Sequence, residues 1–182
     1  RTGVPYFEGP DVARLFRALF MESVGAAERL LDLGCGTGFL LAEIGSLLSA
    51  SGVAGAALVG LDLSLAMLRR AAGSARRSGP GPVFACGSSY QLPFRDGAFS
   101  RVVCRTAPCD GREVSRCLKE DGRLLVYEQG PDDFFELREH FKHRYTIRPR
   151  WSGPQWLETI RVELLGSGFT AVDVWEHWVT QF

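Results

Sequence analysis

The sequence lacks a charge excess of either sign, and it lacks an apolar run long enough to cross a membrane. Lys plus Arg and Asp plus Glu both number 21, so the formal net charge is zero. A neutral chain has no overall field that attracts nucleic acid or an anionic membrane. The apolar run from Val53 to Leu61 stops at Asp62, which is too short for a bilayer. We therefore expect no nucleic-acid partner and no membrane partner.

A disulfide framework and a structural metal site are also not indicated. The cysteines are odd in number, no pair has the C-x-x-C spacing, and each lies in or beside an apolar run. Such cysteines behave as small buried residues in a reducing compartment. The first residues lack the charged-then-apolar order of a signal peptide. We therefore predict a cytoplasmic protein without a metal. The cysteines are Cys35, Cys86, Cys104, Cys109 and Cys117.

The 182 residues predict a single domain, 1–182, that buries roughly two-thirds of its unfolded surface. In residues 1–26, Tyr6 and Phe7 lie in a stretch bounded by proline and glycine, and Asp11 then caps an amphipathic helix. We expect residues 1–26 to form a lid or helix over a cleft. The alternative is that the two aromatic residues only anchor a loop.

The stretch from Leu30 to Leu41 predicts a strand, a tight turn and a helix, around which the rest of the chain is arranged. Arg29 to Leu33 is a short run typical of a buried strand. Gly34, Gly36 and Gly38 follow on alternate positions, and glycine permits unusual backbone angles and close approach of a ligand. The following helix would present unpaired N–H groups and its positive end to an anionic group.

A second apolar strand, Ala57 to Leu61, ends at Asp62. An acidic side chain at the tip of the second strand can accept hydrogen bonds from two ribose hydroxyls. The glycine spacing differs from the dinucleotide fingerprint G-x-G-x-x-G, whose third glycine would fall at Phe39. The turn and the acidic residue together indicate a nucleoside ligand.

Four segments of the sequence resemble the class I S-adenosylmethionine-dependent methyltransferases, and most closely their small-molecule group. The segments occur in the family's order and at about its spacing. The resemblance implies a Rossmann-like, doubly wound α/β fold with a mostly parallel sheet and helices on both faces. It also implies S-adenosyl-L-methionine as cofactor and S-adenosyl-L-homocysteine as product. The segments are Leu31-Asp-Leu-Gly-Cys-Gly-Thr-Gly38, Gly60-Leu-Asp-Leu-Ser64 with Met67-Leu68, Leu92-Pro-Phe94, and Asp96 with Phe99.

The resemblance also implies the cofactor site. The methionine part is expected beside the glycine turn, the ribose at Asp62, and the adenine between apolar walls and the turn after the third strand. The family usually has aspartate at the position of Ser88; serine can accept the same hydrogen bond from the adenine, without the negative charge. For Met67, a place in the core is the alternative. The expected cofactor-binding residues are Asp32, Gly34, Cys35, Gly36, Thr37, Gly38, Asp62, Leu63, Met67, Ser88, Ser89 and Arg105.

Further elements complete the predicted sheet. The third strand is expected at Val83–Cys86, the fourth at Arg101–Cys104, and the fifth at Gly122–Glu128 after a turn that starts at Lys119. The segment between the fourth and fifth strands is shorter than is general in the family, so the acceptor pocket is open or part of its loop is absent from this chain.

The C-terminal part predicts one more helix and one more strand. Ser152 to Gln155 has the pattern of a capping box, and the helix after it ends at Gly166. Phe169–Trp178 alternates in the manner of a sixth strand. The family usually adds a seventh, antiparallel strand, so the sheet is one strand short or the chain is a trimmed piece.

Methyl transfer from a sulfonium is an in-line displacement, in which the protein mainly aligns the nucleophile with the methyl carbon. A general base can assist a hydroxyl or amine acceptor, and histidine is the natural base near neutral pH. His140 and His143 lie within residues 129–168, where the family builds its acceptor pocket, and they are the catalytic candidates. A surface or structural place is the alternative for each. We predict methyl transfer to O, N or C of a small molecule.

Two other functions stay open. Pro108–Cys109 is similar to the nucleophile motif of nucleic-acid cytosine-5 methyltransferases, although a dipeptide often arises by chance and no target-recognition region follows. The chain could instead be a repurposed, non-catalytic member of the family that binds the cofactor as a structural ligand, which the serine at position 88 favours. The acceptor and the oligomeric state do not follow from the sequence.

Overall fold

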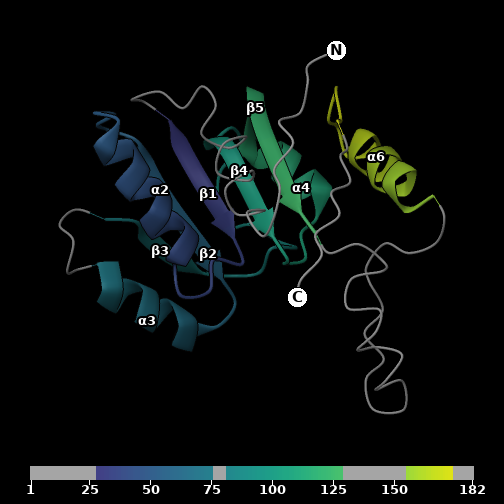
Figure 1. Ribbon diagram of the computed structural model, residues 1–182. Helices are drawn as coiled ribbons and strands as arrows, with labels where there is room; N and C mark the ends of the chain where they lie inside the picture. Colours follow the sequence, from purple (N-terminus) through teal and green to yellow (C-terminus); the bar gives the residue numbers. More distant parts are fainter. Residues whose placement is uncertain (1–27, 76–80, 129–154, 174–182) are drawn as a thin grey trace, which may run out of the picture. The chain divides into compact units, whose positions relative to one another are not determined.

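The computed structural model describes residues 28–75, 81–128 and 155–173 (Figure 1). The chain divides into two compact units, Arg1–Tyr127 with Val179–Phe182, and Glu128–Trp178. The single domain over 1–182 therefore stays a prediction. The helix expected after Asp11, and the candidates His140 and His143, lie outside the described residues. No helix in the described part of the chain is long and apolar enough to span a membrane.

Five parallel strands of the first unit form one sheet in the order β3-β2-β1-β4-β5. The central strand is β1; β2 and β3 follow on one side of it, and β4 and β5 follow on the other side. Such sheets bind ligands at the carboxyl ends of the strands, at the point where the strand order switches from one side to the other. The predicted Rossmann-like α/β class is confirmed. The strands are β1 (Arg29–Leu33), β2 (Ala57–Asp62), β3 (Val83–Cys86), β4 (Phe99–Arg105) and β5 (Leu118–Tyr127).

The strand register brings the carboxyl ends of the central strands to one level. Leu33 at the end of β1 pairs with Leu61 on β2 and with Cys104 on β4. Asp62 pairs with Cys86 at the end of β3. The residues that follow these ends therefore share one edge of the sheet.

Helix α2 (Phe39–Ala50) covers one face of the sheet (Figure 1). Its apolar stripe packs against β1 and β4, and burying each leucine contributes about 2 kcal/mol. Neighbouring strand residues point to opposite faces, so Leu31 and Val102 lie on the other face, where both are also fully buried. The buried residues of the α2 cluster are Leu30, Leu40, Ile44, Leu48 and Val103.

Two further helices of this unit start at capping residues. The Oγ atom of Ser64 accepts a hydrogen bond from the Met67 N–H at 3.4 Å, and α3 (Leu65–Ala75) follows. The Oδ1 atom of Asp110 accepts hydrogen bonds from two backbone N–H groups at the start of α4 (Gly111–Cys117). The short segment between β4 and β5 thus still contains a helix.

The fifth strand departs from the prediction at its start. β5 begins at Leu118, whereas the sequence predicts a turn from Lys119 to Gly122 before the strand. Phe99 pairs with Leu118 and Arg101 pairs with Arg123, so β5 advances five residues while β4 advances two. The expected turn residues therefore form an irregularity within the strand instead of preceding it.

The second unit contains α6 (Trp156–Gly166), which ends where the sequence predicts. Gln155 is the N-cap residue of this helix and makes no side-chain cap hydrogen bond, whereas the expected capping box places it inside the helix; Ser152 lies outside the described residues. The sixth strand is not seen in its described part, since residues 169–173 are not a strand. The rest of that predicted strand lies outside the described residues.

Candidate functional site

The glycines after β1 have positive φ angles, 71° at Gly34, 53° at Gly36 and 75° at Gly38. Residues with a Cβ atom rarely adopt this left-handed conformation. A Cβ on Gly34 would also collide with the Cβ of Ala107, which follows β4. A Cβ on Gly36 would meet no described atom within 4 Å. The turn is therefore packed at Gly34 and faces open space at Gly36.

Asp62 connects this turn to the tip of β2. Its Oδ2 atom accepts a hydrogen bond from the Gly36 N–H at 2.8 Å, and its Oδ1 atom accepts one from the Ser64 N–H at 2.8 Å. Each carboxylate oxygen has a second lone pair, so Asp62 can accept further hydrogen bonds from ligand hydroxyls. The structure thus brings the acidic residue and the glycine turn together, as the sequence predicts.

Asp32 is a buried carboxyl group in β1, and only 3% of its surface is exposed. Among the described residues, no group donates a hydrogen bond to its carboxylate. Burial raises the pKa of Asp32 to about 7; nearby Arg105 lowers this pKa, and the charge of Asp62 raises it. A ligand cation beside Asp32 would therefore favour its charged form.

Cys35 is a packing residue of the turn. Its thiol is close to β2, because a Cβ on Gly60 would come within 2.7 Å of its Sγ atom. Burial, together with the charges of Asp32 and Asp62, raises the pKa of Cys35 to about 12. The thiol is therefore neutral at physiological pH and is not a nucleophile. Thr37, two residues on, is exposed.

Leu63 and Met67 present apolar surface beside the tip of β2. Leu63 is 77% exposed and Met67 is 39% exposed. Met67 is therefore not a core residue, which removes the alternative considered for it. Exposed apolar side chains in this place suit a flat, aromatic ligand group.

The turn after β3 lies next to these residues. The Gly87 N–H donates a hydrogen bond to the Asp62 carbonyl at 3.2 Å, which ties the end of β3 to that of β2. The Oγ atom of Ser88 accepts a hydrogen bond from the Tyr90 N–H at 3.2 Å. The Ser88 hydroxyl can still donate one hydrogen bond. Ser88 and Ser89 are both partly exposed at this edge.

No motif in the sequence points to Thr106, the residue after β4. It has a φ of 49° and is the one non-glycine residue with a positive φ in the described part of the chain. Its N–H donates a hydrogen bond to the Tyr127 carbonyl at 2.8 Å, and its hydroxyl donates one to the Arg105 carbonyl at 2.8 Å. These bonds hold a strained backbone that directs the next residue, Ala107, against Gly34.

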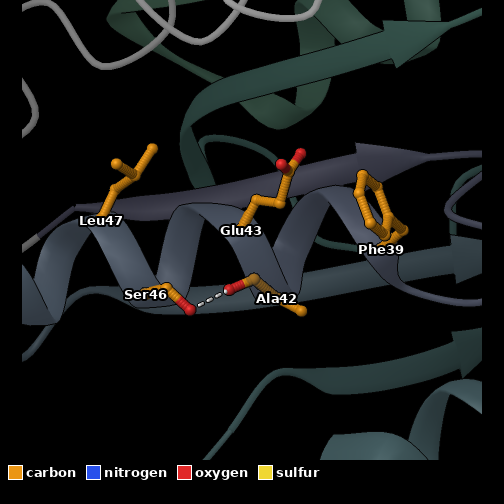
Figure 2. A pocket seen from close by; sticks show the side chains of 5 residues that line it. All are labelled: Phe39, Ala42, Glu43, Ser46 and Leu47. Atoms are coloured by element: carbon orange, nitrogen blue, oxygen red, sulfur yellow. Dashed lines mark hydrogen bonds between the residues drawn. The ribbon is translucent and has the colours of Figure 1, made fainter.

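An open hollow along α2 is a second place where a ligand could be considered, besides the carboxyl edge of the sheet (Figure 2). The Ser46 hydroxyl donates a hydrogen bond to the Ala42 carbonyl at 2.9 Å, so it is used within the helix. Phe39 and Leu47 offer only apolar surface, and Glu43 is the one charged residue of the lining. This lining lacks the set of polar groups that would hold a nucleoside, and the carboxyl edge of the sheet is the candidate site.

The profile of a family described as Methyltransferase domain matches residues 30–126, more than half of the chain. The matched range begins in β1, contains the glycine turn and Asp62, and ends in β5. The chain belongs to this family. The resemblance to the methyltransferases is therefore confirmed.

Relatives of this methyltransferase domain have several names. A malonyl-[acyl-carrier protein] O-methyltransferase of Legionella pneumophila is 36% identical over 135 residues, which are 69% of this chain and 44% of that protein. The uncharacterized methyltransferase YcgJ of Bacillus subtilis is 30% identical over 137 residues, 70% of this chain and 50% of the relative. The chain thus spans about half the length of these curated relatives.

Solved structures show the same fold. The YcgJ structure matches with a TM-score of 0.52 at 28% identity, and the match covers 70% of this chain and 56% of YcgJ. The structure of the [4+2]-cyclase SpnF matches with a TM-score of 0.53 at 25% identity, covering 69% of this chain and 50% of SpnF. The fold is thus shared by proteins named for different reactions.

The residues at the carboxyl edge fit the cofactor that the family implies. The open space at Gly36 admits a ligand close to the backbone, and Asp32 is a buried carboxyl group suited to the ammonium group of an amino acid part. Asp62 has acceptor capacity for hydroxyls, and Leu63 provides exposed apolar surface for a purine. The predicted residues are thus brought together, except for His140 and His143, which lie outside the described residues.

Proposed function

We propose that this methyltransferase domain binds S-adenosylmethionine and transfers a methyl group to O, N or C of a small-molecule acceptor. The observation that carries the proposal is the hydrogen bond between Gly36 and Asp62, with the buried carboxyl of Asp32 close by. This arrangement combines a backbone that a ligand can approach, acceptors for ribose hydroxyls and a partner for a cation.

The cofactor-binding residues divide by the part of the cofactor they would hold. Asp32 and Arg105 would face the amino acid part, through opposite charges. Asp62 would accept hydrogen bonds from the ribose hydroxyls. The residues of the glycine turn would lie beside the methionine part, and they are Gly34, Cys35, Gly36, Thr37 and Gly38. The residues that would surround the adenine are Leu63, Met67, Ser88 and Ser89.

When bound, S-adenosylmethionine supplies a methyl group on a positively charged sulfur, and transfer leaves S-adenosylhomocysteine. The contribution of the chain is to fix the cofactor and to align the acceptor, because sulfur leaves without help from an acid. A base is needed only for an acceptor that must lose its proton during transfer. His140 and His143 are proposed for that role, and residues 129–168 for the acceptor pocket.

The names of the relatives guide the choice of acceptors. The Legionella pneumophila protein is named as an O-methyltransferase whose acceptor is malonyl-[acyl-carrier protein]. This name supports testing carboxylic acids first, both free and carried by a protein.

Free thiols on all five cysteines agree with a reducing compartment such as the cytoplasm.

A repurposed function is the alternative. SpnF, named as a [4+2]-cyclase, shows that this fold also occurs in a protein named for another reaction. The nucleic-acid interpretation of Pro108–Cys109 gains no support, because Cys109 is 4% exposed and its thiol is not available to attack a base.

The experiment is a methyl-transfer assay with S-adenosylmethionine labelled in its methyl group. Carboxylic acids, phenols and amines are offered in turn, and mass spectrometry detects both labelled product and S-adenosylhomocysteine. Labelled product from the unmodified chain, and none from Asp62→Ala, is the expected result. Cofactor binding without transfer to any acceptor would favour the repurposed function. Absence of both binding and transfer would contradict the proposal.

A further inference from the structure

Arg116 in α4 holds the loop that follows the turn at Ser88 and Ser89. Its Nη1 atom donates hydrogen bonds to the Phe94 carbonyl at 2.8 Å and to Oδ1 of Asp96 at 2.7 Å. Its Nη2 atom donates one to the Leu92 carbonyl at 3.2 Å. One guanidinium thus binds three points of a five-residue stretch of loop that has no regular secondary structure.

Glu113, one helical turn earlier, binds the same loop, and we call Glu113 and Arg116 together the clamp. Its Oε2 atom accepts a hydrogen bond from the Leu92 N–H at 2.7 Å and one from Nη2 of Arg116 at 2.9 Å. Its Oε1 atom accepts one from Nε of Arg116 at 3.0 Å. The hydrogen bonds from Arg116 and Leu92 lower the pKa of Glu113. Both the N–H and the carbonyl of Leu92 are therefore held by the same pair of side chains.

The helix that carries the clamp is fixed in the first unit. Val114 and Cys117 of α4 are fully buried. The Asp110 N–H donates a hydrogen bond to the Ser89 carbonyl at 3.4 Å, so the start of α4 also contacts the turn after β3. Beyond the loop, the Gly97 N–H donates one to the Arg116 carbonyl at 3.0 Å. Short α4 is thus connected to both ends of the segment from Ser89 to Gly97.

We propose that Glu113 and Arg116 are positioning residues for the adenine side of the cofactor site, because they fix the loop that directly follows Ser88 and Ser89. The inference rests on the proposed function, which places the adenine at these two serines. It adds residues that have no contact with the cofactor in that proposal and act through the loop.

The chemistry of the pair explains why both residue types are needed. Arginine has a planar fork of five donors, so one side chain can bind two carbonyls and two carboxylates at once. Lysine has the same charge on a single nitrogen and cannot reach all of these acceptors. An exposed ion pair alone contributes little, but here the two side chains also hold backbone groups of the loop.

The test uses two ligands and three variants of the full chain. S-Adenosylhomocysteine contains both the adenosine and the amino acid part, and 5′-methylthioadenosine contains the adenosine without the amino acid part. Calorimetric titration gives the dissociation constant and the stoichiometry of each. Arg116→Lys changes the clamp, and Arg112→Lys is the matched control, because Arg112 lies on the same helix with an exposed side chain. Asp32→Asn changes the amino acid side.

Arg116→Lys is expected to weaken both ligands by the same factor, about tenfold, with unchanged stoichiometry. Asp32→Asn should weaken S-adenosylhomocysteine far more than 5′-methylthioadenosine, and Arg112→Lys should equal the unmodified chain. Equal affinities for Arg116→Lys and the unmodified chain would overturn the inference. Fewer binding sites per chain with an unchanged dissociation constant would also overturn it, because that result indicates partial unfolding. If the unmodified chain binds neither ligand, the proposed function fails as well.

Two substitutions of Glu113 provide a readout that needs no ligand. In Glu113→Ala the Leu92 N–H loses its acceptor, so its hydrogen exchange should accelerate while that of Leu31 in the central strand stays slow. Glu113→Gln retains an oxygen for the Leu92 N–H and should restore most of this protection and most of the affinity. Unchanged Leu92 exchange in Glu113→Ala, or no rescue by Glu113→Gln, would overturn the inference.

Discussion

The backbone N–H of Gly36 donates a hydrogen bond to Oδ2 of Asp62 at 2.8 Å, and this bond joins the glycine turn after β1 to the tip of β2. The other oxygen of Asp62 accepts a hydrogen bond from the Ser64 N–H at 2.8 Å. The same carboxylate therefore shapes the turn and, in the proposed function, faces the ribose. Structure and binding at this site are coupled through one side chain.

Asp62→Ala is expected to abolish cofactor binding and to lower the free energy of unfolding by about 1–3 kcal/mol, because two N–H groups lose their acceptor. Asp62→Asn retains one oxygen and should lose less stability. Urea denaturation and calorimetric titration measure the two effects separately. Unchanged binding by Asp62→Ala would contradict the site assignment.

Gly34→Ala and Gly36→Ala form a matched pair of substitutions, because both residues have positive φ angles but only Gly34 lacks space for a Cβ. Gly36→Ala should cost about 1 kcal/mol of stability, and Gly34→Ala should cost clearly more because of the collision with Ala107. Gly36→Ala should nevertheless bind the cofactor at least about tenfold more weakly, since its Cβ enters the open space. Wild-type affinity in Gly36→Ala would argue against a ligand at this position.

Asp32 should make stability depend on pH. Its pKa is about 7 in the folded chain, above its value in the unfolded chain, so the folded state holds the proton more tightly. The stabilisation is complete below about pH 4 and is lost as pH rises through 7, up to roughly 4 kcal/mol. Asparagine resembles the protonated form, so Asp32→Asn should match the unmodified chain below about pH 4 and exceed its stability at pH 8. Parallel stability curves for the two chains would exclude a raised pKa.

The same group should release a proton on binding. Near pH 6 Asp32 is mostly protonated, and the ammonium group of the cofactor would favour its charged form. Titration of S-adenosylhomocysteine in buffers of different ionisation enthalpy measures this release. We expect the unmodified chain, but not Asp32→Asn, to release a proton at pH 6. Equal proton counts in the two chains would remove Asp32 from the amino acid side.

The sequence was sufficient for the elements whose signal is local. The strand before Gly34 and the strand Val83–Cys86 are confirmed, because apolar runs act over a few residues. The turn at Lys119–Gly122 was predicted where the structure has an irregularity within β5, since pairing with β4 extends the strand past it.

The contacts made by the clamp could not be predicted in the same way. Glu113 and Arg116 have the spacing of an ordinary helical ion pair, and their carbonyl partners lie more than 20 residues away in the chain. Thr106 carries no turn signal of its own, because its positive φ depends on the bond to Tyr127 in the neighbouring strand. Tertiary contacts decide both features.

Cys86 should be the cysteine that reacts first with iodoacetamide. It is exposed, whereas Cys35, Cys104, Cys109 and Cys117 are buried. Its Sγ atom lies 3.6 Å from the Leu63 carbonyl, so it is beside the proposed adenine site. Saturating S-adenosylhomocysteine should slow its labelling, as peptide mass spectrometry would show, and Cys86→Ser should remove the fast-labelled site. Equal labelling rates with and without the ligand would place the adenine elsewhere.

The most direct test of cofactor binding is calorimetric titration of the full chain with S-adenosylmethionine and S-adenosylhomocysteine, with NAD as the control. We predict binding of the first two with dissociation constants on the order of micromolar, and no binding of NAD. Binding of NAD in place of the sulfur-containing ligands, or binding of none of the three, would contradict the proposed site.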